Sequence, residues 1–186
     1  MIKKHLIFWV LLFSALSVAG CGQVFSLKNT NRVTRSGVTS SDYQACVASQ
    51  LTLASSFPQG MTGNELQEFT LTNHGTTGCT LSGYPSLSLT YSGGALHILT
   101  TQGTIGQTIP VTMVVLASGK KAFFEASYPI VTTSGLGNCP IATQIGVTLP
   151  QGGTVTLASI RIPDCSGAIG VSPFYGAVPK TATPTP

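Results

Sequence analysis

Short runs of alternating apolar and polar residues fill the sequence between positions 42 and 178. This alternation constrains the fold more than any other feature. Phe69 and Leu71, like Val147 and Leu149, lie two positions apart with a polar residue between them. A period of two places such side chains on one face of a β-strand, whereas an amphipathic helix needs a period of 3.6. The pattern therefore predicts a domain built from strands.

The same alternation and the intervening turns predict the number of strands. Glycine-containing turns such as Asn73–Gly75, Ser92–Gly94 and Gln151–Gly153 separate the apolar runs. Only Gly63–Gln67 has a short helical possibility. About 8–10 short strands at this spacing predict a single antiparallel β-sandwich over residues 42–178. The other predicted strand faces are Leu51/Leu53, Leu87/Leu89/Tyr91, Leu96/Ile98, Val111/Met113/Val115, Phe123/Glu125/Ser127, Val155/Leu157/Ile160/Ile162 and Ile169/Val171.

The N-terminus has the organisation of a secretory signal peptide. Lys3 and Lys4 precede an apolar run that begins at Leu6 and fades into small residues before Cys21. The segment from Leu6 to Gly20 is shorter than the roughly 20 apolar residues that a membrane-spanning helix needs. We therefore expect residues 1–20 to be a cleaved signal peptide rather than a retained span.

The four residues Val18-Ala-Gly-Cys21 resemble the bacterial lipobox. This resemblance implies that the Cys21 thiol is acylated, as by palmitate, and that the chain is cut before it. Two or three acyl chains would then hold the protein on the outer face of the bacterial cell membrane, with the domain extracytoplasmic. Plain secretion with a free Cys21 thiol is the alternative. The polar stretch 22–41 reads as a flexible tether, and the Pro/Thr-rich residues 179–186 as a frayed tail.

The cysteine count supports acylation of Cys21. The chain has five cysteines, so an acylated Cys21 leaves an even four in an oxidising compartment. Four cysteines allow three pairings. We favour Cys46–Cys79 and Cys139–Cys165, because each pair brackets one compact stretch. No Cys-x-x-Cys motif is present, and His74 and Cys79 have no suitably spaced partners, so we expect no metal site.

The charge pattern argues against nucleic acid as a partner. Charged residues make up only 8% of the chain, and the net charge of +4 falls when Lys3 and Lys4 leave with the signal peptide. From Asp42 onward, four basic residues stand against five acidic ones. A nucleic-acid-binding domain would carry a basic stripe, and none is visible.

One block resembles a known family. It runs from Phe69 to Leu89 and contains Asn73, then Cys79-Thr-Leu81, then Gly83-Tyr-Pro85. This is similar to the family called domain of unknown function 4232, found in secreted and lipid-anchored bacterial proteins. The likeness extends over roughly residues 46–174, with Ser118 where the family usually has proline. It implies an immunoglobulin-like β-sandwich and the disulfide pairing favoured above. It implies no activity.

The sequence contains no catalytic motif. It lacks the Gly-x-Ser-x-Gly elbow of hydrolases and a phosphate-binding glycine loop, so no catalytic residue and no cofactor is expected. His74 lies in a turn, and His97 lies in an apolar strand. Tyr84 is more simply read as a buried aromatic at a corner than as an exposed ligand-stacking residue.

Two classes of function and one structural role follow. The preferred one is a non-catalytic module that binds an envelope protein or polysaccharide through sandwich loops, with 59–65, 102–108 and 132–138 as candidate loops and His74, His97 and Tyr84 as candidate binding residues. A hydrolase that uses His74 or His97 is the second, and a structural envelope spacer the third. A groove that gathers His74, Glu65, Glu68 and Tyr84 would favour an enzyme.

Overall fold

The computed structural model describes residues 43–106, 108–132 and 138–177. Contacts divide the chain into two units, Met1–Gly37 and Val38–Pro186. All described residues belong to the second unit. The predicted signal peptide, Cys21 and the whole predicted tether lie outside the described residues.

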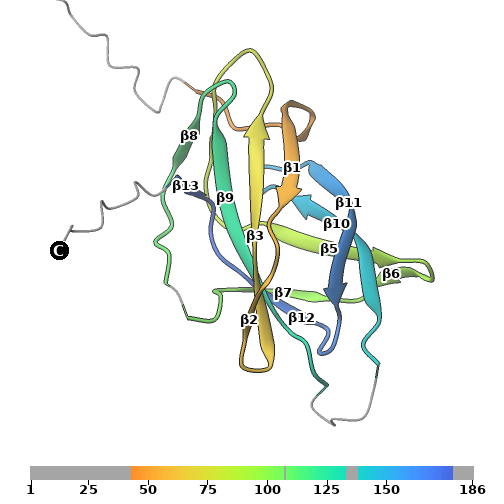
Figure 1. The fold of residues 1–186 in the computed structure, drawn as a ribbon. Helices are drawn as coiled ribbons and strands as arrows, with labels where there is room; N and C mark the ends of the chain where they lie inside the picture. The colour runs from red at the N-terminus through yellow and green to blue at the C-terminus, as the bar shows by residue number, and fades with distance from the viewer. Residues whose placement is uncertain (1–42, 107, 133–137, 178–186) are drawn as a thin grey trace, which may run out of the picture. The chain divides into compact units, whose positions relative to one another are not determined.

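A mixed sheet of seven strands forms one layer of the domain (Figure 1). Its main path runs β1-β3-β9-β12-β7, while β2 pairs with β3 and β13 pairs with β9. All of these pairs are antiparallel except β12 with β7. The strands are β1 (Leu51–Ser55), β2 (Gln59–Met61), β3 (Asn64–Asn73), β7 (Leu99–Gln102), β9 (Lys121–Pro129), β12 (Ala168–Val171) and β13 (Tyr175–Gly176).

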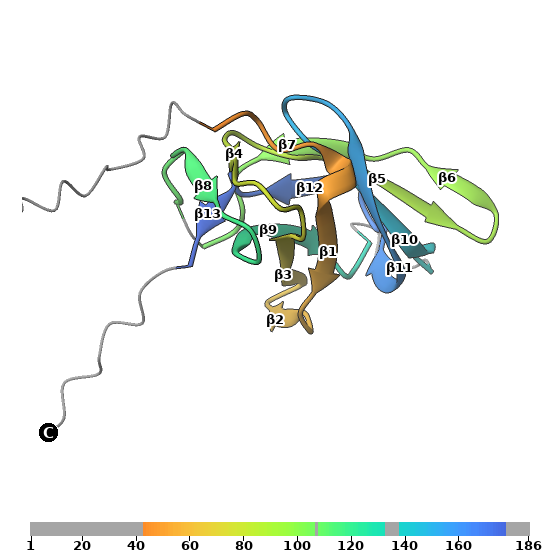
Figure 2. The ribbon, with the colours of Figure 1, turned by 90° about the horizontal axis from the view of Figure 1, so that it is seen from above.

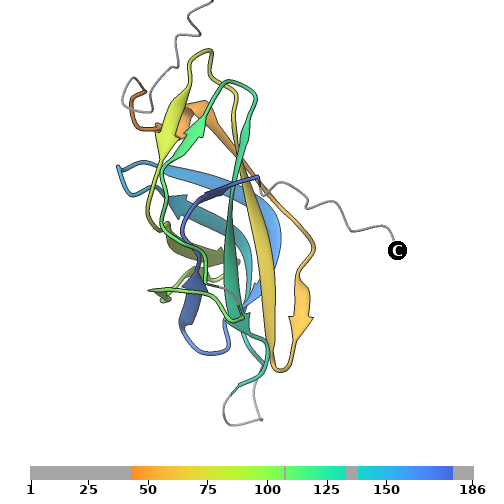
Figure 3. The same ribbon diagram turned by 90° about the vertical axis from the view of Figure 1, so that its left-hand side faces the viewer.

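A four-stranded antiparallel sheet forms the other layer, in the order β11-β10-β5-β6. The hairpin of β5 and β6 extends beyond its neighbours, as Figures 1 and 2 both show. A two-stranded sheet of β4 and β8 lies near the C-terminal end of β3 (Figure 3). The strands are β4 (Cys79–Leu81), β5 (Ser86–Tyr91), β6 (Gly94–Leu96), β8 (Val114–Leu116), β10 (Ile141–Thr148) and β11 (Thr154–Pro163). The described residues also form a 3-10 turn, η2 (Ala48–Gln50).

One hydrophobic core holds the layers together. Phe69 and Phe124 are fully buried and stack with ring centroids 5.1 Å apart, and Phe174 packs edge-on against Phe124 at 5.8 Å. Such aromatic pairs contribute about 0.5–1.5 kcal/mol beyond the area they bury. From the other layer, Leu89 and Ile145 join the same cluster with no exposed surface. The prediction of an all-β sandwich is therefore confirmed.

Both predicted disulfides are present. Cys46 bonds to Cys79 and Cys139 bonds to Cys165, each with Cα atoms 4.8 Å apart. Cys46 and Cys79 are almost fully buried, whereas Cys139 and Cys165 are only partly buried. The two disulfides therefore lie in different environments.

Several local predictions were wrong. The described residues form thirteen strands rather than 8–10, because pieces of two to four residues such as β2 and β13 add to the longer ones. Val111 and Met113 precede β8 and are exposed, and the buried face of β8 is Val114 and Leu116. That register is set by tertiary contacts, since Leu116 pairs with Cys79 across the small sheet.

The stretch with a helical possibility, Gly63–Gln67, belongs to a hairpin. Asn64 begins β3, and Leu66 pairs with Gln59 of β2 on one side and with Ser127 of β9 on the other. Pairing on both sides overrides the local propensity. Tyr91, predicted to share a face with Leu87 and Leu89, is 37% exposed at the end of β5, where the chain turns into β6.

Candidate functional site

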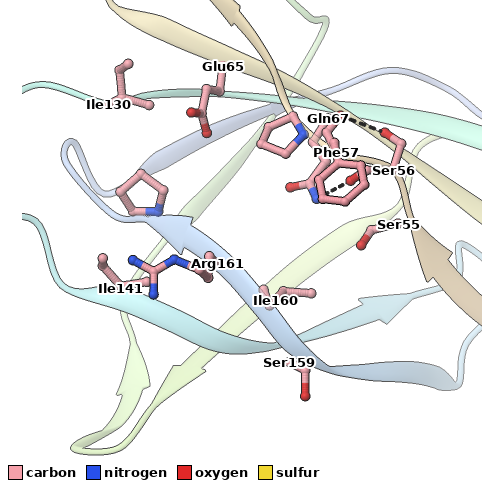
Figure 4. A pocket seen from close by; sticks show the side chains of 12 residues that line it. Ser55, Ser56, Phe57, Glu65, Gln67, Ile130, Ile141, Ser159, Ile160 and Arg161 are labelled. Carbon is pink, nitrogen blue, oxygen red and sulfur yellow. Dashed lines mark hydrogen bonds between the residues drawn. The ribbon is translucent and has the colours of Figure 1, made fainter.

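A cleft opens between the two layers where β1 ends, β3 begins and β11 ends. Its volume is about 510 Å³, within the range of small-ligand pockets. Figure 4 shows side chains from both layers around it. The lining residues are Ser55, Ser56, Phe57, Pro58, Glu65, Gln67, Ile130, Ile141, Ser159, Ile160, Arg161 and Pro163.

Two opposite charges face this cleft from opposite layers. Glu65 comes from β3 and Arg161 from β11, and among the described residues of the lining only these two are charged (Figure 4). Within the part of the chain that the structure describes, Glu65 and Arg161 form no ion pair within 4.0 Å. Neither charge is therefore neutralised by the other, although the Glu65 carboxylate shares a side-chain hydrogen bond with Tyr128.

The polar groups beneath them are already bonded to each other. The buried Tyr128 hydroxyl donates to Oε1 of Gln67 at 3.0 Å, and Nε2 of Gln67 donates to the carbonyl of Ser56 at 2.9 Å. Burial raises the pKa of Tyr128 above its ordinary value of 10.0, and the nearby Glu65 carboxylate raises it further. The Tyr128 hydroxyl therefore stays protonated and keeps Gln67 in place as a rigid floor.

The β11 wall carries an irregular backbone. Ala142 of β10 pairs with Ile162, and Gln144 pairs with Ala158, so Ser159–Arg161 lie opposite Thr143 alone. Ser159 has φ of 63°, the only positive φ among the described non-glycine residues. Such strain costs on the order of 1–3 kcal/mol and is concentrated at functional sites, as bulges are. The bulge turns both Ser159 and Arg161 toward solvent at the cleft.

The rim of the cleft is apolar, and a disulfide stabilises one side of it. Phe57 follows β1 and is 94% exposed, which is unusual for a phenylalanine in a soluble domain. Ile141 and Pro163 pair at the other side of the rim, next to the Cys139–Cys165 bridge. The Cys139–Cys165 disulfide thus links the start of β10 to the end of β11 on this side of the cleft.

The opposite end of β3 is a closed polar network around Asn73, called here the Asn73 end. The fully buried Asn73 donates to the carbonyls of Thr77 and Leu116 at 2.8 and 2.9 Å. Its Oδ1 accepts from the backbone N–H of Gly75 at 2.9 Å and from Nε2 of Gln50 at 3.3 Å. All four hydrogen-bonding positions of this amide are therefore used inside the protein.

The rest of the Asn-to-Pro block is also structural. Cys79, Thr80 and Leu81 are buried in β4, and Pro85 is buried. Gly83 has φ of +89°, which favours glycine, and its carbonyl accepts a hydrogen bond from the N–H of Phe174 at 2.9 Å. The block that carries the family resemblance builds the fold and does not line the cleft.

The structure separates the residues that the sequence singled out as a possible site. His74 is exposed beside Asn73, about nine residues and therefore roughly 30 Å along β3 from Glu65. His97 is exposed between β6 and β7. Tyr84 is partly buried and packs against the core. The cleft does not gather His74, Glu65, Glu68 and Tyr84, because of these four residues only Glu65 lines it.

Glu68 belongs to a second acidic group on the outer face of the larger sheet. It lies directly opposite Glu125 of β9, and its Oε2 accepts a hydrogen bond from the Tyr175 hydroxyl at 3.0 Å. Burial raises the pKa of Glu125, and the charge of Glu68 raises it further, while a hydrogen bond from Tyr175 lowers it. This group stabilises the attachment of β13 and lies away from the cleft.

Among the described residues of the three candidate loops, only those of the first contribute to the cleft. Residues 59–65 form the hairpin of β2 and β3 rather than a loop, and they supply Glu65. Residues 102–108 include the end of β7 and a turn, with position 107 outside the described residues. Most of 132–138 is likewise undescribed.

Comparison with family models gives one match, over residues 46–175, to the domain of unknown function (DUF4232). The chain belongs to this family. Comparison with curated proteins and with solved structures returns no match. The DUF4232 match spans the cleft and the Asn73 end alike. Among its described residues, the chain has no group of three or more His, Cys, Asp and Glu side chains arranged to hold a metal, and no helix long and apolar enough to cross a membrane.

The sequence interpretation missed most of the cleft, although signals for it were present. Leu157 and Ile160 are three positions apart in a run that otherwise alternates by two, and this break marks the bulge of β11. Phe57 stands alone between polar residues and Pro58 after a strand. Neither signal indicates that the two segments come together.

Proposed function

We propose that this DUF4232 protein is a non-catalytic, lipid-anchored binding module of the bacterial cell envelope, whose ligand occupies the cleft beside Phe57. The observation that carries the proposal is that Glu65 and Arg161 lie on facing walls of a 510 Å³ cleft with an exposed aromatic rim and form no ion pair with each other. Exposed apolar groups with a few convergent polar ones are typical of ligand sites. The described residues of the lining include no histidine and a single carboxylate, which favours binding over catalysis.

The proposed extracytoplasmic localisation rests on Cys21 and on the two disulfides, which are typical of an oxidising compartment. Acylation of Cys21 would place the domain on the outer face of the membrane. We further propose that the sandwich is of the immunoglobulin type, supported by two mainly antiparallel layers around one core. Replacing Cys21 with Ala should release the protein from membranes in a fractionation experiment, and continued retention would count against the anchor.

The binding role is tested with envelope material and matched surface variants. Full-length protein with Phe57→Ala should retain less envelope protein or polysaccharide than wild type. Tyr91→Ala, which removes another exposed aromatic at the far hairpin, should retain the same amount. Equal retention by wild type and Phe57→Ala would contradict the proposed site. If a measured hydrolytic activity disappears when His74 and His97 are both replaced by Ala, the protein is an enzyme instead.

A further inference from the structure

We infer that the ligand of the cleft is a short peptide with free termini, whose carboxylate binds Arg161 and whose ammonium group binds Glu65. This inference rests on the proposed binding function and adds the chemical class of the ligand. It starts from the charges, because Glu65 and Arg161 come from facing layers and form no ion pair within 4.0 Å in the described chain.

The charge arrangement favours a molecule with both signs. A lone anion would leave the Glu65 carboxylate uncompensated, and a lone cation would leave the Arg161 guanidinium uncompensated. Arg is suited to a carboxylate because its planar guanidinium donates two parallel hydrogen bonds. A zwitterion satisfies both walls at once. Gln67 contributes less, since its amide is already bonded to Ser56 and Tyr128.

The backbone of the β11 wall favours a peptide over a sugar. β11 is the last strand of its sheet, so one of its edges has no strand partner among the described residues. The bulge also leaves Ser159–Arg161 without individual partners in β10. An exposed strand edge recognises the N–H and C=O groups of an extended peptide, which a saccharide lacks. A volume of about 510 Å³ limits the ligand to a few residues.

The lining also predicts the character of the peptide side chains. Phe57, Ile130, Ile141 and Ile160 surround the charged pair, and the first three are exposed at the rim. These groups favour a small aliphatic side chain between the two charged termini. The residues that contact the ligand backbone would come from β11, while β3 supplies the carboxylate.

The test is isothermal titration of the full-length protein, purified in detergent, with the tripeptide alanyl-valyl-alanine. Wild type should bind the free peptide, and blocking either terminus, by N-acetylation or C-amidation, should weaken binding about tenfold or more, as expected for a charged hydrogen bond. Arg161→Gln and Glu65→Gln should each weaken binding of the free peptide similarly. Lys120→Gln, which removes a positive charge at the Asn73 end, should bind like wild type.

A double-mutant cycle assigns each terminus to its wall. C-amidation should have little further effect in Arg161→Gln, and N-acetylation little further effect in Glu65→Gln. Equal affinity for free and doubly blocked peptide, or fully additive effects of amidation and Arg161→Gln, would overturn the peptide assignment. Binding of chitotetraose but not of the tripeptide, with loss in Phe57→Ala, would also overturn it while leaving the binding module intact. If no probe binds and Phe57→Ala retains envelope material normally, both the assignment and the proposed function fail.

Discussion

At one end of β3, the Asn73 amide makes four hydrogen bonds and has no exposed surface; at the other end, Glu65 faces an open cleft opposite an unpaired Arg161. The Asn73 end is closed by a buried disulfide, and the cleft is bordered by a half-exposed one. The same strand thus begins at a cleft with two opposite charges that do not pair with each other and ends in a network whose hydrogen-bonding positions are all used. We therefore expect the Asn73 end to contribute most to stability and, under the proposed function, the cleft to contribute to binding.

The largest expected effect comes from removing one disulfide at a time. Cys46→Ala with Cys79→Ala should lower the free energy of unfolding by about 3–5 kcal/mol, because it also opens a cavity among buried residues. Cys139→Ala with Cys165→Ala should cost about 2–3 kcal/mol, since these residues are only partly buried. Urea unfolding monitored by circular dichroism measures both. An equal or larger loss for the second pair would contradict the assignment of stability to the Asn73 end.

The Asn73 network gives the next largest effect. Asn73→Ala removes four hydrogen bonds and leaves the buried carbonyl of Leu116 without the donor it uses, so we expect a loss of about 3 kcal/mol. His74→Ala, the exposed neighbour, should change stability by less than about 0.5 kcal/mol. The matched pair is compared by thermal unfolding. Similar midpoints for the two variants would show that the network contributes little.

The pH dependence of the unfolding free energy tests the buried carboxylate of Glu125, which belongs neither to the Asn73 end nor to the cleft. The pKa of Glu125 is raised above 4.5 in the folded state, so the native protein holds this proton more tightly than the unfolded chain. The corresponding stability is fully present below about pH 4.5 and is lost as pH rises through the raised pKa. Glu125→Gln should therefore be more stable than wild type at pH 7.

The measurement compares unfolding free energies of Glu125→Gln and wild type from pH 4.5 to 7.5. The difference should grow with pH across this window. Glu68→Gln is a control that removes the like charge, the second cause of the raised pKa of Glu125, and keeps an amide oxygen that can accept from Tyr175, so it should flatten the profile only in part. The Asn73 network contains no titratable side chain and adds no slope. A constant difference between Glu125→Gln and wild type would refute a raised pKa at this position.

The smallest expected effect concerns the strained wall of the cleft. Ser159→Gly relieves the cost of a positive φ but increases the entropy of the unfolded chain, so stability should rise by no more than about 1 kcal/mol. Ser159→Val should destabilise, because a β-branched residue resists this conformation. Chemical unfolding of both variants is the measurement. If both leave stability unchanged, the strain at Ser159 is not significant.

The sequence determined much of the fold and little of the candidate site. The period of two at Phe69/Leu71 and Ile169/Val171 correctly predicted buried strand faces, since alternation is a local property of a strand. It failed at Val111, Met113 and Val115, where a pairing with β4 set the register. Glu65 was weighed as an acid beside Glu68, yet the strand turns these two side chains to different surroundings.

By itself, the sequence determined an all-β domain and the family, because these follow from local alternation and motif spacing. Cysteine parity predicted two disulfides, and the structure decided among the three possible pairings in favour of the expected one. Only the tertiary structure decided where chemistry can occur. Phe57 and Arg161 are 104 positions apart, and Glu65 lies in a different layer from Arg161. Their meeting depends on how two sheets pack and on a bulge in β11, which no local pattern specifies. The cleft is therefore a property of the packing of the two layers.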